Sequence, residues 1–349
     1  MRAFIRLFTV AASLLAARLP AVEWVRAGLN TNQPVWGVRG GLLWAIPPGG
    51  FPAPGGPRGL LRLGYPNLTN GGYQLINFIA VEPIARGRRG LSELEFSRLD
   101  RKPGKRLWAM DTTTNSFADA ARTLMPGKLS KLASGRERLD VELGVERFEN
   151  RAHVRLAVSQ FSDAPDELQF TVHSEPDSVP LEYCILTATM GNKARTRQLW
   201  LKDEAVSSRN LYPELKTDDF APHQVYPLER LPRTPDQDVV VALTTDEENP
   251  SAVFPFPGRR SWHYDGYKLT QYWKKPRGSF RDDLQVAVNA RYTYWQSHQA
   301  IPGGVAFENF ELRERFYDGQ TFVFGLTRKT PEELGVSTGT SRKRSRPSR

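Results

Sequence analysis

Residues 303–325 read GGVAFENFELRERFYDGQTFVFG, and their alternation predicts a half-buried β-strand, a turn and a second strand. Counted by twos, Glu308 falls on the same side of the first strand as Phe310, whereas Glu311 and Arg313 point to the other side. A carboxylate that an apolar face carries out of water has a raised pKa. Glu308 is therefore a candidate catalytic acid or base, and a structural carboxylate paired to an arginine explains the same pattern.

Comparable patterns recur along the rest of the chain and predict its fold class. Short segments that alternate in polarity, or are rich in β-branched and aromatic residues, are typical of antiparallel strands. They predict an all-β protein built as a large antiparallel β-sandwich of the supersandwich kind, with one short helix. The dipeptides Gly191-Asn192 and Asp318-Gly319 predict two-residue hairpin turns. The predicted strands are 73–81, 138–146, 151–159, 167–173, 181–189, 194–202, 238–244, 268–273, 284–294, 305–313 and 320–327.

Two further segments predict a helix and a loop. The short helix should span residues 116–125, from a cap at Ser116 to a stop at Pro126. Residues 47–66 are dense in proline and glycine, which predicts an ordered loop that crosses the surface.

The chain divides into a leader, one domain and a tail. Residues 1–21 combine a positive start with a short apolar run, which predicts a secretory signal peptide and a secreted or periplasmic protein. No composition shift interrupts residues 22–334, so we expect a single large β-sandwich domain there. Residues 335–349 are polar, basic and free of aromatic residues, and they predict a disordered basic tail.

The net charge of +10 is concentrated at the two ends of the chain. Three arginines precede residue 22 and five basic residues follow residue 334, with no acid in either segment, so the domain itself is nearly neutral. A nucleic-acid-binding face needs clustered charge on the domain, and we therefore expect no nucleic-acid partner. The apolar run of the leader is too short to span a bilayer, and no other long apolar stretch predicts a transmembrane segment.

The sequence carries no recognisable cofactor or metal motif, and we predict neither. Cys184 is the only cysteine, and its apolar neighbours predict a buried side chain, so a centre with several thiolate ligands is excluded. The five histidines are far apart, and GxGxxG, P-loop and GxSxG patterns do not occur. A metal site assembled from distant strands stays open.

Aromatic residues gather between positions 262 and 295, where flat rings with hydroxyl or indole donors suit the faces and hydroxyls of sugars. The alternative is that they pack in the core. His263 and Asp265 lie two residues apart, so Asp265 could orient the imidazole of His263 as a general acid. A surface turn at Asp265-Gly266 explains the same pattern. The substrate-binding candidates in this region are Trp262, Tyr264, Tyr272, Trp273, Tyr294 and Trp295.

Basic residues gather between positions 86 and 106. Arg86, Arg88 and Arg89 are further substrate-binding candidates, because guanidinium groups bind carboxylates through paired hydrogen bonds and would suit an acidic polysaccharide. The alternative is a solvated loop whose arginines pair with its own acids.

The segment GVAFE at residues 304–308 resembles the strand that carries a glutamate general base in galactose-mutarotase-like supersandwich proteins. The FYDGQTFVFG that follows is similar to the turn and last strand of that fold. The resemblance is confined to residues 303–325, and it implies a carbohydrate ligand and a catalytic Glu308. The epimerases of this family also carry a histidine in an Asn-His-aromatic-Asn motif, whereas LINF at residues 75–78 has none, so sugar mutarotation is not expected.

These features together predict an exported carbohydrate-active protein that acts on or binds a polysaccharide. In its catalytic form, lyase or hydrolase chemistry on an acidic polysaccharide uses Glu308 as acid or base, with His263 and Asp265 as its partners. The alternatives are a non-catalytic carbohydrate-binding protein and a structural protein of the cell envelope.

Overall fold

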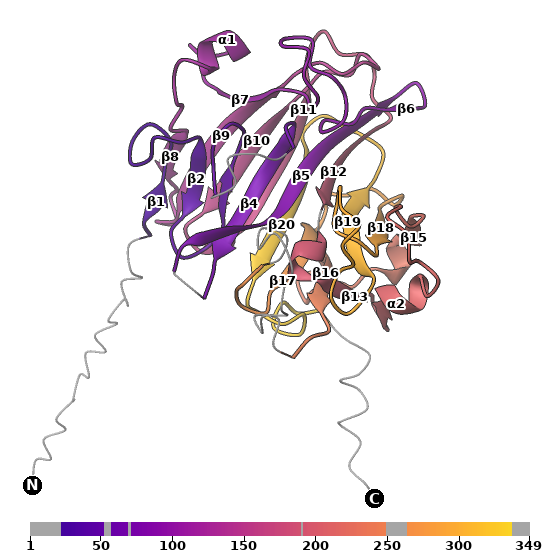
Figure 1. The fold of residues 1–349 in the computed structure, drawn as a ribbon. Coiled ribbons are helices and arrows are strands. Elements are labelled where there is room, and N and C mark those ends of the chain that lie inside the picture. Colours follow the sequence, from indigo (N-terminus) through magenta and orange to yellow (C-terminus); the bar gives the residue numbers. More distant parts are fainter. Residues whose placement is uncertain (1–21, 52–56, 69–70, 190, 249–263, 337–349) are drawn as a thin grey trace, which may run out of the picture.

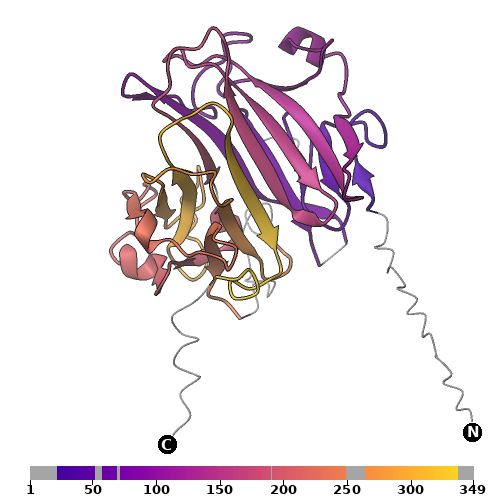
Figure 2. The same cartoon turned by 180° about the vertical axis from the view of Figure 1, so that it is seen from behind.

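The computed structural model describes residues 22–51, 57–68, 71–189, 191–248 and 264–336. Two large antiparallel sheets face each other across a shared core (Figure 1). Figure 2 shows the same two layers from behind. The predicted all-β sandwich is confirmed. No helix in these ranges is long and apolar enough to cross a membrane.

The first sheet has ten strands, and its path runs from the N-terminal strands to the strand of the decisive segment. Neighbouring strands pair in antiparallel register throughout. The order is β1 (Trp24–Val25), β2 (Val35–Val38), β3 (Leu43–Ala45), β4 (Leu60–Pro66), β5 (Tyr73–Ala85), β12 (Tyr183–Thr189), β19 (Ala306–Arg313), β18 (Gln285–Arg291) and β15 (Gln224–Pro227), with β6 (Arg88–Arg89) paired to β5.

The second sheet also has ten strands, and short helical segments lie in the connections. Its order is β14 (Ala205–Ser207), β13 (Thr196–Trp200), β16 (Val239–Thr245), β17 (Thr270–Lys275), β20 (Gln320–Thr327), β11 (Ala164–Ser174), β10 (Val154–Phe161), β9 (Glu137–Val145) and β7 (Leu107–Met110), with β8 (Lys128–Lys131) paired to β9. The helical segments are α1 (Phe117–Ala120), η1 (Gly191–Ala194), α2 (Ser208–Leu211) and η2 (Leu228–Arg230).

One continuous apolar cluster fills the space between the sheets. It joins Trp36 and Ile79 of the first sheet to Phe170 and Trp273 of the second. Cys184 belongs to the same cluster, so its predicted burial is confirmed, and burial raises the pKa of its thiol. Each sheet uses one face for this core, which leaves the opposite face of each sheet for other contacts.

Both predicted hairpins are wrong, because each connection crosses from one sheet to the other. Residues 191–194 form η1 between β12 of the first sheet and β13 of the second, and Asp318-Gly319 lies between β19 and β20, which also belong to different sheets. A two-residue hairpin needs its two strands to pair with each other. Both dipeptides do lie in short connections between strands, but these connections join the two sheets.

The predicted helix and loop are shorter than expected. Ser116 caps α1 as predicted, but the helix ends at Ala120, and no residue of it is buried. A short helix without a packed face gains too little to extend. Within the predicted loop 47–66, residues 60–66 form β4, because its leucines pack on both faces of the sheet despite the nearby glycines.

The ordered fold extends slightly beyond its predicted C-terminal limit. Val336 is buried and packs with Val240, Ala242 and Tyr272 on the second sheet. The predicted signal peptide at residues 1–21 and the rest of the predicted tail lie outside the described residues.

Candidate functional site

A β-bulge in β19 decides the direction in which Glu308 points. Phe307 and Phe310 both pack in the sandwich core, although strict alternation would place them on opposite faces. Between them, Glu308 and Asn309 together oppose the single residue Asn289 of β18. The bulge reverses the alternation, so Glu308 lies on the outer face of the first sheet, the face turned away from the core. The prediction that Glu308 shares a face with Phe310 is wrong for this reason.

Glu308 is nevertheless buried, with 1% of its surface exposed. Burial raises its pKa to about 8, although the positive charges of Arg291 and Lys193 oppose the shift. Burial also lowers the pKa of Lys193 to about 8, against the attraction of Glu308. The Oε2 atom of Glu308 has no hydrogen-bond partner in the described parts of the chain. The expected rise in its pKa is thus found, whereas its catalytic role stays a prediction.

Two other glutamates meet on the outer face, and sequence reasoning missed their pairing. Glu82 belongs to β5 and Glu311 to β19, and β12 lies between these strands. Thr187 of β12 pairs directly with Glu311, and Ile185, two residues away, pairs with Glu82. Val81 beside Glu82, and both strand neighbours of Glu311, pack in the core, so both carboxylates point to the outer face.

One hydroxyl and one guanidinium bind both carboxylates. The Thr187 hydroxyl lies 3.0 Å from Glu82 Oε2 and also contacts Glu311 Oε2. Arg89 donates from Nε to Glu82 Oε2 at 2.7 Å and from Nη2 to Glu311 Oε2 at 3.0 Å. Arg313 Nε donates to Glu311 Oε1 at 2.5 Å. We call these five residues the acid-pair site.

A tight hairpin delivers Arg89 to this site. Arg86 and Gly87 join β5 to β6 with φ angles of 54° and 70°, and positive φ at both central positions is the mark of a type I′ turn. The chain therefore folds straight back, and Arg89 returns beside Glu82. The three predicted substrate arginines separate as a result, because Arg89 joins the acid pair while Arg86 and Arg88 are exposed at the turn.

The two carboxylates are driven to opposite protonation states. Burial, followed by the negative charge of Glu311, raises the pKa of Glu82 to about 8. Burial also acts to raise the pKa of Glu311, but Arg89 and Arg313 outweigh it, and the net pKa is lowered. The pair therefore favours sharing one proton, with Glu82 as the member whose pKa is raised and Glu311 as the member whose pKa is lowered. A neutral acid beside an ionised carboxylate is the arrangement that acid–base catalysis uses.

The carboxylates are buried, but the cationic side chains around them reach the surface. The side chains of Arg89, Arg313 and His223 are 29%, 22% and 30% exposed, against 5% for Glu82 and 0% for Glu311. His223 Nε2 lies 4.0 Å from Glu311 Oε1 and has no hydrogen-bond partner within the described ranges. Burial lowers the pKa of His223, so its imidazole is neutral at pH 7. The exposed side of the site is therefore formed by these three side chains.

Most of the predicted sugar-binding aromatics serve the interior instead. Trp273 is fully buried in the sandwich core, where its ring packs edge to face on Phe324. Tyr264, Tyr272 and Tyr294 expose 3% of their surface or less. These four side chains therefore offer no open surface to a ligand, and their assignment as substrate-binding residues is corrected. Trp273 and Tyr264 fill the core between the sheets, whereas Tyr272 and Tyr294 are buried in smaller apolar clusters of their own.

Trp295 is the predicted aromatic residue that stays partly exposed on the outer face. Its ring packs against a small apolar cluster that includes Leu60, Phe78 and Ala80. Ala80 pairs with Thr187, so the indole and the acid pair share one face of the first sheet. A ring in this position retains the predicted ability to stack on a sugar.

The remaining predicted pair is described only in part. The peptide N–H of Asp265 donates to Gln74 Oε1 at 2.8 Å, and its carbonyl accepts from the N–H of Leu68. These bonds tie the backbone of Asp265 to the start of β5. Trp262 and His263 lie outside the described residues, so a role for His263 with Asp265 stays a prediction.

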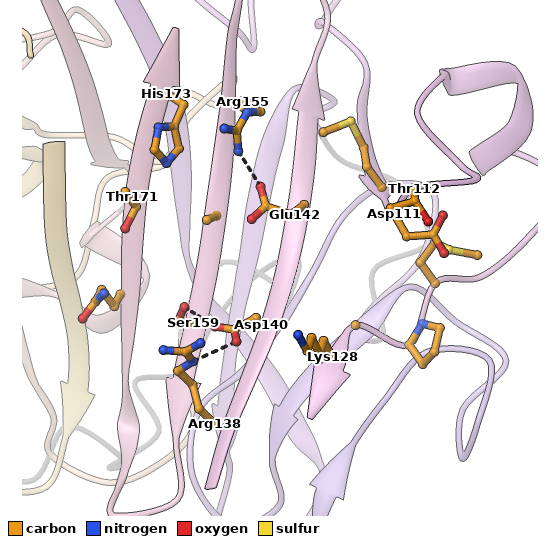
Figure 3. Close-up of a pocket in the computed structure, with 16 residues that line it drawn as sticks. Asp111, Thr112, Lys128, Arg138, Asp140, Glu142, Arg155, Ser159, Thr171 and His173 are labelled. Atoms are coloured by element: carbon orange, nitrogen blue, oxygen red, sulfur yellow. Dashed lines mark hydrogen bonds and ion pairs between the residues drawn. The ribbon is translucent and has the colours of Figure 1, made fainter. Parts of the chain in front are cut away.

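A second polar surface lies on the outward face of the second sheet. Figure 3 shows side chains from β9, β10 and β11 projecting into a groove of about 930 Å³. The charges in it balance, since Arg155 donates to Glu142 at 3.0 Å, Arg138 donates to Asp140 at 2.8 Å, and Lys128 and Asp111 add one charge of each sign. Because these ions compensate one another, the groove suits a neutral polar ligand better than an acidic one.

The chain matches no protein-family model and no curated protein sequence. Across the described ranges, no group of three or more histidine, cysteine, aspartate or glutamate side chains is arranged to hold a metal ion.

Proposed function

We propose that this protein is a carbohydrate-active enzyme that cleaves glycosidic bonds in an acidic polysaccharide, with the acid-pair site as its catalytic centre. The observation that carries the proposal is that two buried carboxylates share Thr187 and Arg89 while their pKa values move in opposite directions. Glycosidases typically use one protonated and one ionised carboxylate.

The two glutamates take different parts in the reaction. Glu82, protonated at neutral pH, gives its proton to the glycosidic oxygen as the bond from C1 to that oxygen breaks and the electron pair stays on the oxygen. Glu311, ionised, bonds to C1 as the glycosidic bond breaks, because two carboxylates that reach one hydroxyl lie too close for a water between them. Water then bonds to C1 and displaces Glu311 as a carboxylate, while Glu82 takes the proton of that water and becomes the acid again.

The groups around the pair favour an anionic sugar. Arg89 and Arg313 combine guanidinium donors with exposed surface, so they can bind a sugar carboxylate while they hold Glu311. Trp295 supplies a partly exposed indole on the same face for stacking on a sugar ring. The resemblance of residues 303–325 to supersandwich carbohydrate-active proteins supports the same class of ligand.

The test is an assay of the protein on neutral and acidic polysaccharides that reads both new reducing ends and unsaturated uronate absorbance. We expect new reducing ends from an acidic substrate, and a loss of activity in Glu82→Gln and in Glu311→Gln. Glu142→Gln is the matched control, because Glu142 is an exposed carboxylate paired to an arginine on the other sheet. Unsaturated uronate products would show that the enzyme cleaves the bond by elimination and not by hydrolysis. Loss of activity in Glu308→Gln but not in Glu82→Gln would identify Glu308, and not the acid-pair site, as the catalytic centre.

A second candidate function is binding of a neutral glycan without turnover in the groove of Figure 3. The observation that favours it is the row of paired ions and hydroxyls, which offers hydrogen bonds without net charge. Binding without turnover by the unmodified protein, abolished in an Arg155→Ala/Glu142→Ala variant and retained in Glu82→Gln, would favour this function over the first.

A further inference from the structure

Exposed apolar side chains are concentrated in the loop that follows β6. Leu94, Phe96 and Leu99 are 53%, 58% and 54% exposed. They are three of the seven large apolar residues found exposed in the described chain, and they lie within six consecutive positions. Scattered exposed apolar residues are ordinary, but a cluster marks a surface that contacts something other than water.

Exposed cations surround these side chains. Arg86 and Arg88 lie at the turn between β5 and β6, and three more cations follow in the loop. Arg88, Leu94 and Phe96 line one surface depression, which places the turn beside the loop. The side chains of all five cations lack an ion pair or hydrogen bond to any residue that the structure describes. We call the eight residues the basic apolar surface: Arg86, Arg88, Leu94, Phe96, Arg98, Leu99, Arg101 and Lys102.

Two acids of the same loop, Glu95 and Asp100, pair with cations, and a third, Glu93, has a buried carboxylate whose pKa is raised by burial. Fully buried Lys105 lies 3.2 Å from Glu95 Oε2, and Arg58 donates to Asp100 Oδ1 at 2.9 Å. Glu149 is the exposed carboxylate that remains in the described lining of the depression. The outward charge of the loop is therefore positive.

Backbone hydrogen bonds hold the loop in a defined shape. The N–H of Ser97 donates to the carbonyl of Lys102 at 2.9 Å, and the N–H of Arg101 donates to the carbonyl of Ser97 at 2.9 Å. The apolar tips are therefore displayed by an ordered turn. In Figures 1 and 2 the β5–β6 hairpin projects at the edge of the molecule, where an extended surface can reach it.

We propose that the basic apolar surface docks this protein on an anionic membrane. Leu94, Phe96 and Leu99 enter the boundary between headgroups and acyl chains, while the five cations face the lipid phosphates. Cations alone would serve a soluble acidic polymer equally well. The apolar side chains distinguish a membrane from a soluble polymer, because their burial is favourable only where an apolar phase lies within reach of the charges.

The experiment is co-sedimentation of the full chain with vesicles of phosphatidylcholine alone and of phosphatidylcholine mixed with phosphatidylglycerol. We expect binding to the anionic vesicles, weak binding to the neutral ones, and loss of binding as salt is raised. Leu94→Ser/Phe96→Ser/Leu99→Ser should weaken binding roughly tenfold or more while every cation remains. Leu29→Ser/Phe220→Ser/Val225→Ser is the matched control, with three exposed apolar residues removed elsewhere, and it should bind as the unmodified chain does.

A second measurement follows insertion directly. The indole emission of a Phe96→Trp variant should shift to the blue when anionic vesicles are added, and should not shift with a soluble acidic polysaccharide. The basic residues 342–349 are present in every variant, so equal binding by the unmodified and the triple-serine proteins would assign adhesion to the chain ends and overturn the proposal. Absence of vesicle binding, or an unchanged indole emission from the Phe96→Trp variant when vesicles are bound, would overturn it as well.

Discussion

Two buried charge clusters in this molecule differ in whether each carboxylate has hydrogen-bond and ion-pair partners of its own. Lys275 and Glu314 form an ion pair in which both side chains are fully buried. Gln320 Nε2 donates to Glu314 Oε1 at 2.9 Å, and the N–H of Arg281 donates to Oε2 at 2.7 Å. One cation therefore meets one anion, and every carboxylate oxygen has a partner. Such a closed cluster is a structural unit.

The acid-pair site has the opposite character. Its two carboxylates compete for the same hydroxyl and the same guanidinium, so one of them keeps a proton at neutral pH. The cations around them are partly exposed, whereas Lys275 is sealed. Burial of charge is common to both clusters and does not identify function. Like charges held together within reach of solvent are the feature that distinguishes the candidate site.

The largest expected effect is on catalysis. Glu82→Gln should lower kcat by a factor of about 10²–10⁴, because the amide keeps the shape of the neutral acid but has no proton to give. The free energy of unfolding should stay the same or rise, since glutamine cannot acquire the buried charge. Kinetics and urea unfolding on the same preparation measure both. A parallel loss of activity and stability would place Glu82 in the same structural class as Glu314.

The Lys275–Glu314 pair should show the reverse pattern. Lys275→Met should lower the free energy of unfolding by about 3–5 kcal/mol, because it leaves Glu314 buried without its cation. The double variant Lys275→Met/Glu314→Met should recover most of that loss. Activity per folded molecule should not change in either variant. A double variant as unstable as the single one would show that the pair contributes more than mutual neutralisation.

The two clusters should also respond differently to pH. Folding raises the pKa of Glu82 from 4.5 to about 8, so the folded state holds this proton more tightly than the unfolded state does. Its contribution to stability is present below pH 4.5 and is lost as the pH rises through about 8. Urea unfolding between about pH 5 and 9 should therefore show a fall in stability that is smaller in Glu82→Gln. The value of kcat should decline over the same basic range as Glu82 loses its proton.

The smallest effect is expected in the groove of Figure 3. The ion pair of Arg155 with Glu142 is about one-third exposed at the arginine and more at the glutamate. Arg155→Ala should therefore change the free energy of unfolding by less than about 1 kcal/mol, with no effect on turnover. A change comparable to that of Lys275→Met would mean that this surface pair stabilises the second sheet in a way its exposure does not explain.

Strand positions follow from local pattern much better than strand partners do. The predicted strand 167–173 lies within β11, and 320–327 coincides with β20, because alternation and β-branched residues are properties of a single segment. The turn dipeptides were equally visible, yet the partners assigned to them were wrong. Pairing depends on which distant strand supplies the next edge, and adjacent residues carry no information on that choice.

The candidate site shows the same division. The placement of Glu311 opposite Phe310 followed from alternation alone, and the raised pKa of Glu308 followed from its burial. The face on which Glu308 lies did not follow from alternation, because the bulge arises from how β19 pairs with β18. Glu82 stood out in no local pattern, since its partner Glu311 lies two strands away.

The amino-acid sequence by itself determined an all-β chain, the position of most of its strands and the outward direction of Glu311 in β19, since these depend on neighbours one or two residues apart. The tertiary structure decided which strands became neighbours, and with them the meeting of Glu82 and Glu311 at Thr187 and the sealing of Lys275 against Glu314. The physical reason is that burial and charge pairing act through space, between residues that the chain alone leaves far apart.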